Sequence, residues 1–159
     1  MALQVNGTEV SSVTLNGNVL DKVTVNGNTV WENWKHSTTV ISKSISSSSG
    51  GWGEWYGFDS GWITLDKPIK NPKGSLYWHT KDTQASNYRG YVRYEDNTEA
   101  QIVSASGGYH GGGETASGTV NFSLTNDKVI IAYKVYAEHQ KFSGSSGATF
   151  KFTDYYQKG

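Results

Sequence analysis

The stretch "VNFSLTNDKVIIAYKVYAEH", residues 120–139, decides the fold class because it has the pattern of a strand, a turn and a second strand. From 120 to 124, apolar residues alternate with Asn and Ser, which is the period of a half-buried β-strand. Asn126-Asp127 then supplies residues typical of a turn. The run 129–137 is largely apolar on both faces, and it therefore predicts a central strand that is covered on both sides.

The same alternation continues on both sides of this stretch, so residues 35–159 are predicted to form one β-rich domain. In the segment 148–155, Phe150 and Phe152 are expected to point inward while their neighbours point outward. No segment of ten or more residues has a helical apolar period. Further strands are predicted at 38–46, 61–65, 75–80, 88–95 and 100–105.

About eight antiparallel strands in about 120 residues are typical of a β-sandwich. We therefore expect an all-β chain whose larger domain is an antiparallel sandwich of jelly-roll type, with an immunoglobulin-like sandwich as the alternative. The order of the strands cannot be read from the sequence. Two Gly-rich stretches, "GGYHGGGETASG" (107–118) and "SGSSG" (143–147), are predicted to be a long mobile loop and a flexible turn.

Residues 1–34 contain a ten-residue pattern that occurs three times. The sequence "LQVNG" at 3–7 returns as "VTLNG" at 13–17 and as "VTVNG" at 23–27. Asn-Gly favours a two-residue type I′ hairpin turn, because both central residues need a positive φ. Aliphatic residues follow the same spacing in each repeat, at positions 3, 5 and 10. The pattern predicts a segment of short β-hairpins that precedes the sandwich domain.

Such short strands cannot form a hydrophobic core alone, because an isolated two-stranded hairpin is at best marginally stable in water. The hairpins must therefore pack on the rest of the chain or on copies of themselves in an oligomer, and the sequence leaves both alternatives open. In the second case the segment is an assembly element. The residues expected to carry its contacts are Val5, Val10, Leu15, Leu20, Val25, Val30 and Trp31.

The three Asn-Gly units and the pair Val30-Trp31 resemble the start of many small bacteriophage virion proteins, which open with V-x-V-N-G-x-x-V-W units. The resemblance covers about a fifth of the chain, from residue 3 to residue 34. It implies a non-enzymatic structural part of a virion, of the tail-tip, fibre or head-decoration type, assembled in the host cytoplasm. The partners we expect are other virion proteins and further copies of this chain, with a trimer favoured, together with a host-surface glycan where the displayed domain serves adhesion.

The charge balance and the composition exclude several classes of partner. Fourteen Lys and Arg residues are balanced by fourteen Asp and Glu residues, so the chain lacks the basic character of proteins that bind nucleic acid or anionic lipid. No apolar run approaches the roughly 18 residues of a membrane span, and the N-terminus lacks the pattern of a signal peptide. The absence of cysteine fits synthesis in a reducing compartment. We expect no nucleic-acid partner and no membrane insertion.

The sequence has no motif that specifies catalysis, a cofactor or a metal. Its four histidines are scattered, and neither a His-Glu-x-x-His pattern nor a calcium loop occurs. No phosphate-binding loop and no Gly-x-Ser-x-Gly nucleophile motif is present. A pair of carboxylates could serve glycoside hydrolysis, but any chain with fourteen acidic residues offers such pairs. We therefore expect no catalytic residues, no cofactor and no metal ligands.

The segment "GGWGEWYGFDSGW", residues 50–62, is rich in aromatic residues separated by glycines. Aromatic faces can stack on the C–H faces of sugars, and nearby carboxylates accept hydrogen bonds from sugar hydroxyls. A carbohydrate-binding module is therefore the alternative function, although the same side chains would equally serve a core or an oligomer interface. The candidate glycan-binding residues are Trp52, Trp55, Tyr56 and Trp62, with Glu54 and Asp59 as polar partners.

Overall fold

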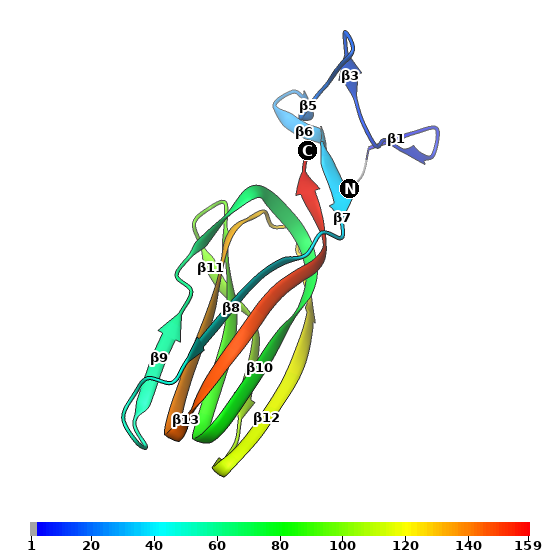
Figure 1. Ribbon diagram of the computed structural model, residues 1–159. Coiled ribbons are helices and arrows are strands. Elements are labelled where there is room, and N and C mark those ends of the chain that lie inside the picture. The colour runs from blue at the N-terminus through cyan, green and yellow to red at the C-terminus, as the bar shows by residue number, and fades with distance from the viewer. Residues whose placement is uncertain (1–2) are drawn as a thin grey trace.

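The structure, a computed structural model, describes residues 3–159 as a set of N-terminal hairpins followed by a β-sandwich (Figure 1). No helix occurs among the described residues, and hence none that is long and apolar enough to cross a membrane. The hairpin strands are β1 (Gln4–Val5), β2 (Thr8–Glu9), β3 (Thr14–Leu15), β4 (Asn18–Val19), β5 (Lys22–Val25) and β6 (Asn28–Glu32). The strands of the larger part are β7 (Trp34–Ser37), β8 (Ile41–Ser47), β9 (Trp55–Asp59), β10 (Ile63–Tyr94), β11 (Glu99–Gly107), β12 (His110–Ser123) and β13 (Ile130–Lys158).

The two long strands, β10 and β13, bend and pass from one layer of the sandwich to the other (Figure 1). In β10 the bend falls at Asp82, a non-glycine residue with a φ of 50°, and the register with both β12 and β13 shifts there. In β13 the corresponding bend falls within 141–145. Each of these strands therefore contributes one half to each of the two sheets.

The order of the strands gives the topology. One sheet has the order β12, β10 (73–81), β13 (145–154) and β8, and the other has the order β11, β10 (83–94), β13 (130–141) and β9. All these pairs are antiparallel. The chain changes sheet between β8 and β9, near the start of β10, at both bends, between β11 and β12, and between β12 and β13. This is the jelly-roll arrangement, so the expected fold is confirmed and the immunoglobulin-like alternative is excluded.

The hydrophobic core lies between the two sheets and is rich in aromatic rings. Phe150 and Phe152 are fully buried, with ring centroids 5.1 Å apart, which confirms that both point inward. Tyr133 packs against both rings from the strand predicted to be central, with centroids 6.1 and 5.5 Å away. Phe122 adds a fourth ring, 5.6 Å from Phe150. Edge-to-face packing of this kind adds to the free energy gained from burying the rings.

The two Gly-rich stretches predicted to be a mobile loop and a flexible turn lie mostly in strands, so both predictions are wrong. β12 takes in most of 107–118, and a Cβ atom at Gly118 would lie 2.8 Å from Nε1 of Trp78. The segment 143–147 lies within β13, where a Cβ atom at Gly144 would overlap the carbonyl oxygen of Lys81. These glycines permit a close approach of neighbouring strands rather than flexibility.

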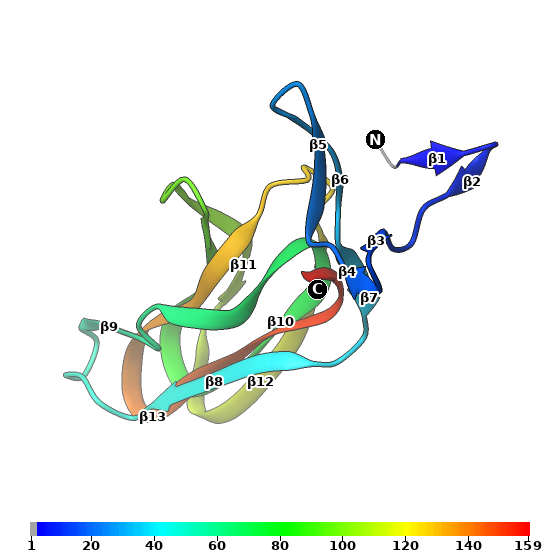
Figure 2. The same cartoon turned by 90° about the horizontal axis from the view of Figure 1, so that it is seen from above.

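Each Asn-Gly pair forms the turn of a hairpin, as the repeat predicts. The three asparagines all have a φ of 51°, and the glycines that follow have φ values of 78° or 79°, which is the type I′ signature. The hairpins β1–β2, β3–β4 and β5–β6 are three separate two-stranded sheets. They point in different directions at the end of the sandwich where the C-terminus also lies (Figures 1 and 2).

Candidate functional site

Each hairpin gathers its aliphatic residues on one face. In the first hairpin Val5 lies opposite Thr8, and the amide of Val10 donates a 2.8 Å hydrogen bond to the carbonyl of Leu3. Leu3, Val5 and Val10 therefore face the same side, because cross-strand partners share a face. The second hairpin repeats this register, and the third repeats it up to a bulge near its base. Positions 3, 5 and 10 of the repeat thus form an equivalent apolar face in each of the first two hairpins and, up to the bulge, in the third.

The aliphatic residue next to each turn is open to solvent. Val5, Leu15 and Val25 are 60%, 61% and 54% exposed, whereas Val10, Leu20 and Val30 at the bases of the hairpins are half-buried. We call Val5, Leu15 and Val25 the tip residues. The three hairpins therefore each present one aliphatic side chain to solvent at the same position of the repeat.

Trp31, the last of the predicted assembly residues, is buried within its own chain. It is only 7% exposed, and its indole N–H donates a 3.1 Å hydrogen bond to the carbonyl of Val10. This bond ties the base of the first hairpin to the third. A cavity of about 310 Å³ lies at the same junction, between Leu3 and Val10 of the first hairpin and Lys70 and Tyr156 of the sandwich.

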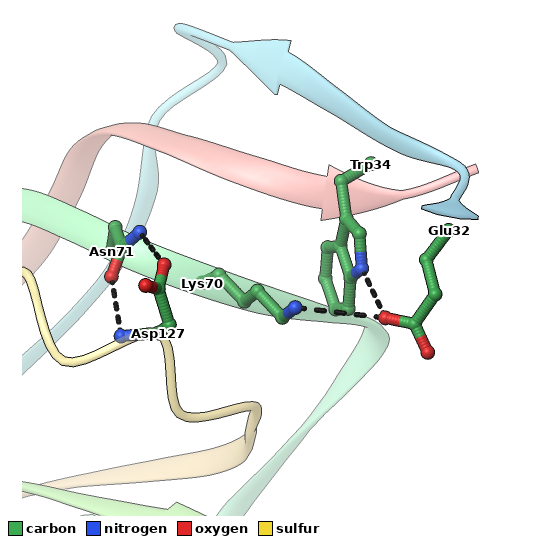
Figure 3. A network of polar contacts seen from close by, with 5 residues as sticks. All are labelled: Glu32, Trp34, Lys70, Asn71 and Asp127. Atoms are coloured by element: carbon green, nitrogen blue, oxygen red, sulfur yellow. Dashed lines mark hydrogen bonds and ion pairs between the residues drawn. The ribbon is translucent and has the colours of Figure 1, made fainter. Parts of the chain in front are cut away.

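A polar network joins the third hairpin to the sandwich (Figure 3). The indole N–H of Trp34 donates a 2.7 Å hydrogen bond to Glu32, whose carboxylate also lies 3.6 Å from the ammonium of Lys70. The same ammonium lies 4.3 Å from the centre of the Trp34 ring. The hydrogen bond from Trp34, followed by the charge of Lys70, lowers the pKa of Glu32 against the opposing effect of burial.

Beside this network a second pair of polar residues joins β10 to the loop before β13 (Figure 3). The side-chain amide of Asn71 donates to a carboxylate oxygen of Asp127 at 2.7 Å, and its oxygen accepts from the Asp127 amide at 2.9 Å. These two hydrogen bonds hold the loop before β13 against β10.

The structure separates the predicted glycan-binding aromatic residues. Trp52, in the connection between β8 and β9, is 73% exposed, and Trp55 on β9 is 51% exposed. Tyr56 is 36% exposed and lies against the buried ring of His139, with ring centroids 5.9 Å apart. Trp52 and Trp55 are therefore exposed to solvent, whereas the ring of Tyr56 is partly packed against His139.

Trp62 lies elsewhere and is covered. The guanidinium of Arg93 and the ammonium of Lys134 lie 4.3 and 4.9 Å from its ring, and Lys134 also lies 5.0 Å from the ring of Tyr91. These cation–π contacts occupy the ring that a sugar would need. Trp62 thus belongs to a row of alternating cations and rings on the outer face of one sheet.

The two predicted polar partners are placed at turns. A carboxylate oxygen of Asp59 accepts a 2.6 Å hydrogen bond from the amide of Gly61. The side chain of Glu54 lies over Gly51, where a Cβ atom would be 2.6 Å from its carboxylate oxygen. Both carboxylates therefore lie against the backbone of a nearby glycine, Gly61 for Asp59 and Gly51 for Glu54.

Trp52 belongs to a cluster that the sequence did not indicate, which we call the distal cluster: Trp52, Tyr109 and Phe142. The ring of Phe142 lies 5.4 Å from Trp52 and 5.7 Å from Tyr109, and Tyr109 is 68% exposed. The three residues come from the β8–β9 connection, the β11–β12 connection and the bend of β13. These segments meet only in the folded chain, so no local pattern could have predicted the cluster.

Asp82 ties together two of the segments that carry the distal cluster. Its carboxylate accepts hydrogen bonds from the amide of Gly113 at 3.2 Å and from the amide of Ser143 at 3.1 Å, and also from the Ser143 hydroxyl. The hydrogen bond from the Ser143 hydroxyl, followed by those from the backbone, lowers the pKa of Asp82. The carboxylate thus fixes the bend of β13 to the start of β12.

His139 fixes the third segment and is fully buried. Its Nε2 lies 2.7 Å from the carbonyl of Ser49, and its Nδ1 lies 2.6 Å from the hydroxyl of Ser146. Because a carbonyl only accepts, Nε2 must carry a proton and donate it to Ser49. His139 therefore has a structural role, and no group of three or more His, Asp or Glu side chains able to hold a metal ion is found among residues 3–159.

No protein-family model and no curated protein matches the sequence. Among solved structures, the enzymatically active domain of bacteriophage CBA120 tailspike protein 4 is similar, with a TM-score of 0.43 and 12% identity over 78% of this chain and 19% of that chain. A chain of the infectious bursal disease virus Gx strain gives a TM-score of 0.41 and 12% identity over 94% of this chain and 41% of that chain.

A carbohydrate-binding module from Cellvibrio mixtus lichenase 5A, in complex with cellotriose, is also similar, with a TM-score of 0.36 and 6% identity over 74% of this chain and 88% of that chain. The present chain spans less than half of the tailspike and virus chains. These are similarities of overall shape, and the assignment of the fold rests on the order of the strands in the two sheets.

Proposed function

We propose that this protein is a non-enzymatic structural component of a virion, in which the hairpins attach the chain to a larger assembly and the jelly roll is displayed. The observation that carries the proposal is the repeated exposure of Val5, Leu15 and Val25 on three separate two-stranded sheets. A two-stranded sheet needs a third strand or a covering layer to be stable in water. Three equivalent tips that lack one in the same chain favour a common acceptor.

The acceptor we propose is a further copy of this chain, in an oligomer with a trimer favoured. Within residues 3–159, neither edge of any hairpin pairs with a third strand, so the backbone groups of both edges can pair with another strand. The hairpins of a second copy have the same register and the same apolar face, so the edge strand of any repeat can pair with the edge strand of any other. Other virion proteins would contact the same segment once the oligomer is part of the particle.

The side chains of the sandwich support a non-enzymatic role. Glu138 accepts hydrogen bonds from Asn87 and Tyr136 at 2.9 Å each and pairs with Arg89 at 3.7 Å, while Glu99 pairs with Arg93 at 2.8 Å. These carboxylates thus have partners from their own sheet, which is typical of structural surface networks.

Removal of the first two hairpins tests the proposal. A variant that lacks residues 3–20 and carries Val25→Asp keeps the Glu32 network but has none of the three apolar tips, so we expect a folded sandwich that no longer forms the oligomer. The mass measured by light scattering should fall to that of one chain, while the circular dichroism of the β-sheet remains. An unchanged mass together with unchanged folding would contradict the proposal.

A second function, carbohydrate binding by the sandwich, is favoured by a separate observation. Trp52 and Trp55 are 73% and 51% exposed. They belong to the β8–β9 connection and the start of β9, which lie at the end of the sandwich away from the hairpins (Figure 1). In a displayed domain, such side chains are available to a host-surface glycan. Titration of the intrinsic tryptophan fluorescence with glycans tests this function, and a response that survives in Trp52→Ala and Trp55→Ala would contradict it.

A further inference from the structure

The connections that carry the distal cluster lie at the end of the sandwich opposite the hairpins (Figure 1). Trp52 and Tyr109 are 73% and 68% exposed, and Phe142 lies between them as a half-buried support. Exposed aromatic rings of this kind usually mark a place where a ligand or partner binds. The cluster would therefore stay accessible to solvent when the hairpins are bound in an assembly.

The open area of the cluster is small. An aromatic side chain offers about 200 Å², so two rings that are about seven-tenths exposed offer roughly 300 Å². A stable protein interface needs about 800 Å² from each partner. The cluster therefore suits a small ligand with a flat apolar face better than a second protein.

The surroundings of the cluster are polar but have little net charge. The bend of β13, which carries Phe142, lines a cavity of about 330 Å³ together with Gly113 of β12, and the serines of this lining are Ser48, Ser143 and Ser145. Lys81 and Asp82 are the two charged residues of its lining, and they balance each other. The volume lies at the lower end of the range of small-molecule sites, and hydroxyl groups can both donate and accept hydrogen bonds.

The backbone beside the rings is held in place by contacts that need no ligand. The amide of Gly53, next to Trp52, donates a 2.8 Å hydrogen bond to the carbonyl of Lys141, and Gln140 donates one of 3.1 Å to the Gly53 carbonyl. On the other side, the carboxylate of Asp82 accepts hydrogen bonds from Gly113 and Ser143. A site that is ordered in advance loses less entropy on binding.

We propose that the distal cluster binds an uncharged saccharide, whose C–H face stacks on Trp52 and Tyr109 while the serine hydroxyls of the adjoining cavity contact its hydroxyl groups. The proposal gives a ligand class and a site to the second proposed function, on which it rests. It adds Tyr109 and Phe142 to the site and excludes Trp62, whose ring is covered by Arg93 and Lys134.

Native affinity electrophoresis of the full chain tests the proposal. The probes are four soluble uncharged polysaccharides: hydroxyethylcellulose, dextran, yeast mannan and arabinogalactan. We expect at least one of them to retard the protein, and Trp52→Ala and Tyr109→Ala to weaken that retardation about tenfold each, which corresponds to about 1.4 kcal/mol. Tyr109→Phe keeps the ring and should retain most of the binding.

Two control substitutions separate the distal cluster from the rest of the molecular surface. Tyr77→Ala removes a tyrosine that is 38% exposed on β10, in the sheet that contains β12. This change should leave the retardation unchanged. Leu15→Asp in the second hairpin should also leave it unchanged, so loss of assembly and loss of binding are distinguishable. The proposal is overturned if none of the four polysaccharides retards the protein, or if Trp52→Ala and Tyr109→Ala bind as well as the native chain. Oligomerisation that these two variants abolish would likewise overturn it and assign the cluster to a protein interface.

Discussion

The hairpins and the sandwich are built from the same alternation of apolar and polar residues, yet they bury their apolar residues to very different extents. The tip residues of the hairpins are 54–61% exposed, whereas Phe150 and Phe152 of the sandwich are fully buried. Each sandwich sheet packs against a second sheet about 10 Å away, whereas each hairpin has only its own second strand. An alternating pattern thus specifies which face of a strand is apolar, and burial of that face depends on what covers it.

The largest expected effect comes from truncating a core side chain. Phe150→Ala should lower the free energy of unfolding by about 3–5 kcal/mol, because it leaves a cavity among Phe122, Tyr133 and Phe152. Leu15→Ala, the matched change at a hairpin tip, should alter it by less than about 0.5 kcal/mol in the monomer. Urea denaturation of the dissociated chain measures both. Equal losses in the two variants would remove the distinction between the regions.

A methyl group added at a glycine is expected to cost more in the sandwich than in a hairpin turn. Gly144→Ala places a methyl group against the carbonyl oxygen of Lys81 where the two long strands cross, so we expect a loss of about 1–3 kcal/mol. Gly17 has a φ of 79° but nothing within 4 Å of a Cβ atom, so Gly17→Ala should cost about 1–2 kcal/mol locally, from backbone strain alone. Thermal unfolding of the sandwich should therefore respond to the first change and be unaffected by the second.

The hairpins and most sandwich strands could be predicted from the sequence because they depend on local rules. Asn-Gly fixes each turn through its positive φ values, and the period of two places Phe150 and Phe152 in the core. The bends of β10 and β13 could not be predicted in the same way. Asp82 and Gly144 look like turn residues, and only the crossing of two distant strands shows that they belong inside strands.

The candidate site was predictable only in part, for a similar reason. Trp52 stands out in the sequence because it lies in a segment that is dense in aromatic residues. Its neighbours Tyr109 and Phe142 are 57 and 90 residues away in sequence, and each is an isolated aromatic residue that carries no signal of a shared surface. Trp62 had the same sequence signal as Trp52, but Arg93 and Lys134 cover it from other strands.

A smaller effect, dependent on pH, is expected at Asp82. Its pKa is lowered in the folded chain, so its carboxylate stabilises the fold above its ordinary pKa, and this contribution is lost as the pH falls through the folded value. Asp82→Asn should therefore lower the Tm at neutral pH, and the difference from the native chain should shrink in acid. A Tm difference that stays constant with pH would show that the charge of Asp82 has no part in holding the distal end.

The smallest effect is expected at the hairpin end, at Glu32. The pKa of Glu32 is lowered in the folded chain, as that of Asp82 is, so its charged carboxylate stabilises the contact with Trp34 and Lys70 at neutral pH. Glu32→Gln should therefore weaken this contact at neutral pH and have less effect below about pH 4. Hydrogen exchange of residues 28–37, compared between variant and native chain at each pH, measures the change. If the variant exchanges faster by the same factor in acid as at neutral pH, the charge of Glu32 does not stabilise this contact.

The most direct test of the central claim, that the hairpins join this chain to further copies, is sedimentation velocity of the native chain and of a variant with Val5→Asp, Leu15→Asp and Val25→Asp. Charges at the three tips should prevent their burial without disturbing the sandwich, whose core they do not touch. We predict that the native chain sediments as an oligomer, with a trimer favoured, and that the variant sediments as a folded monomer of 17.4 kDa. If both sediment as monomers, or both as the same oligomer, the hairpins are not the assembly element.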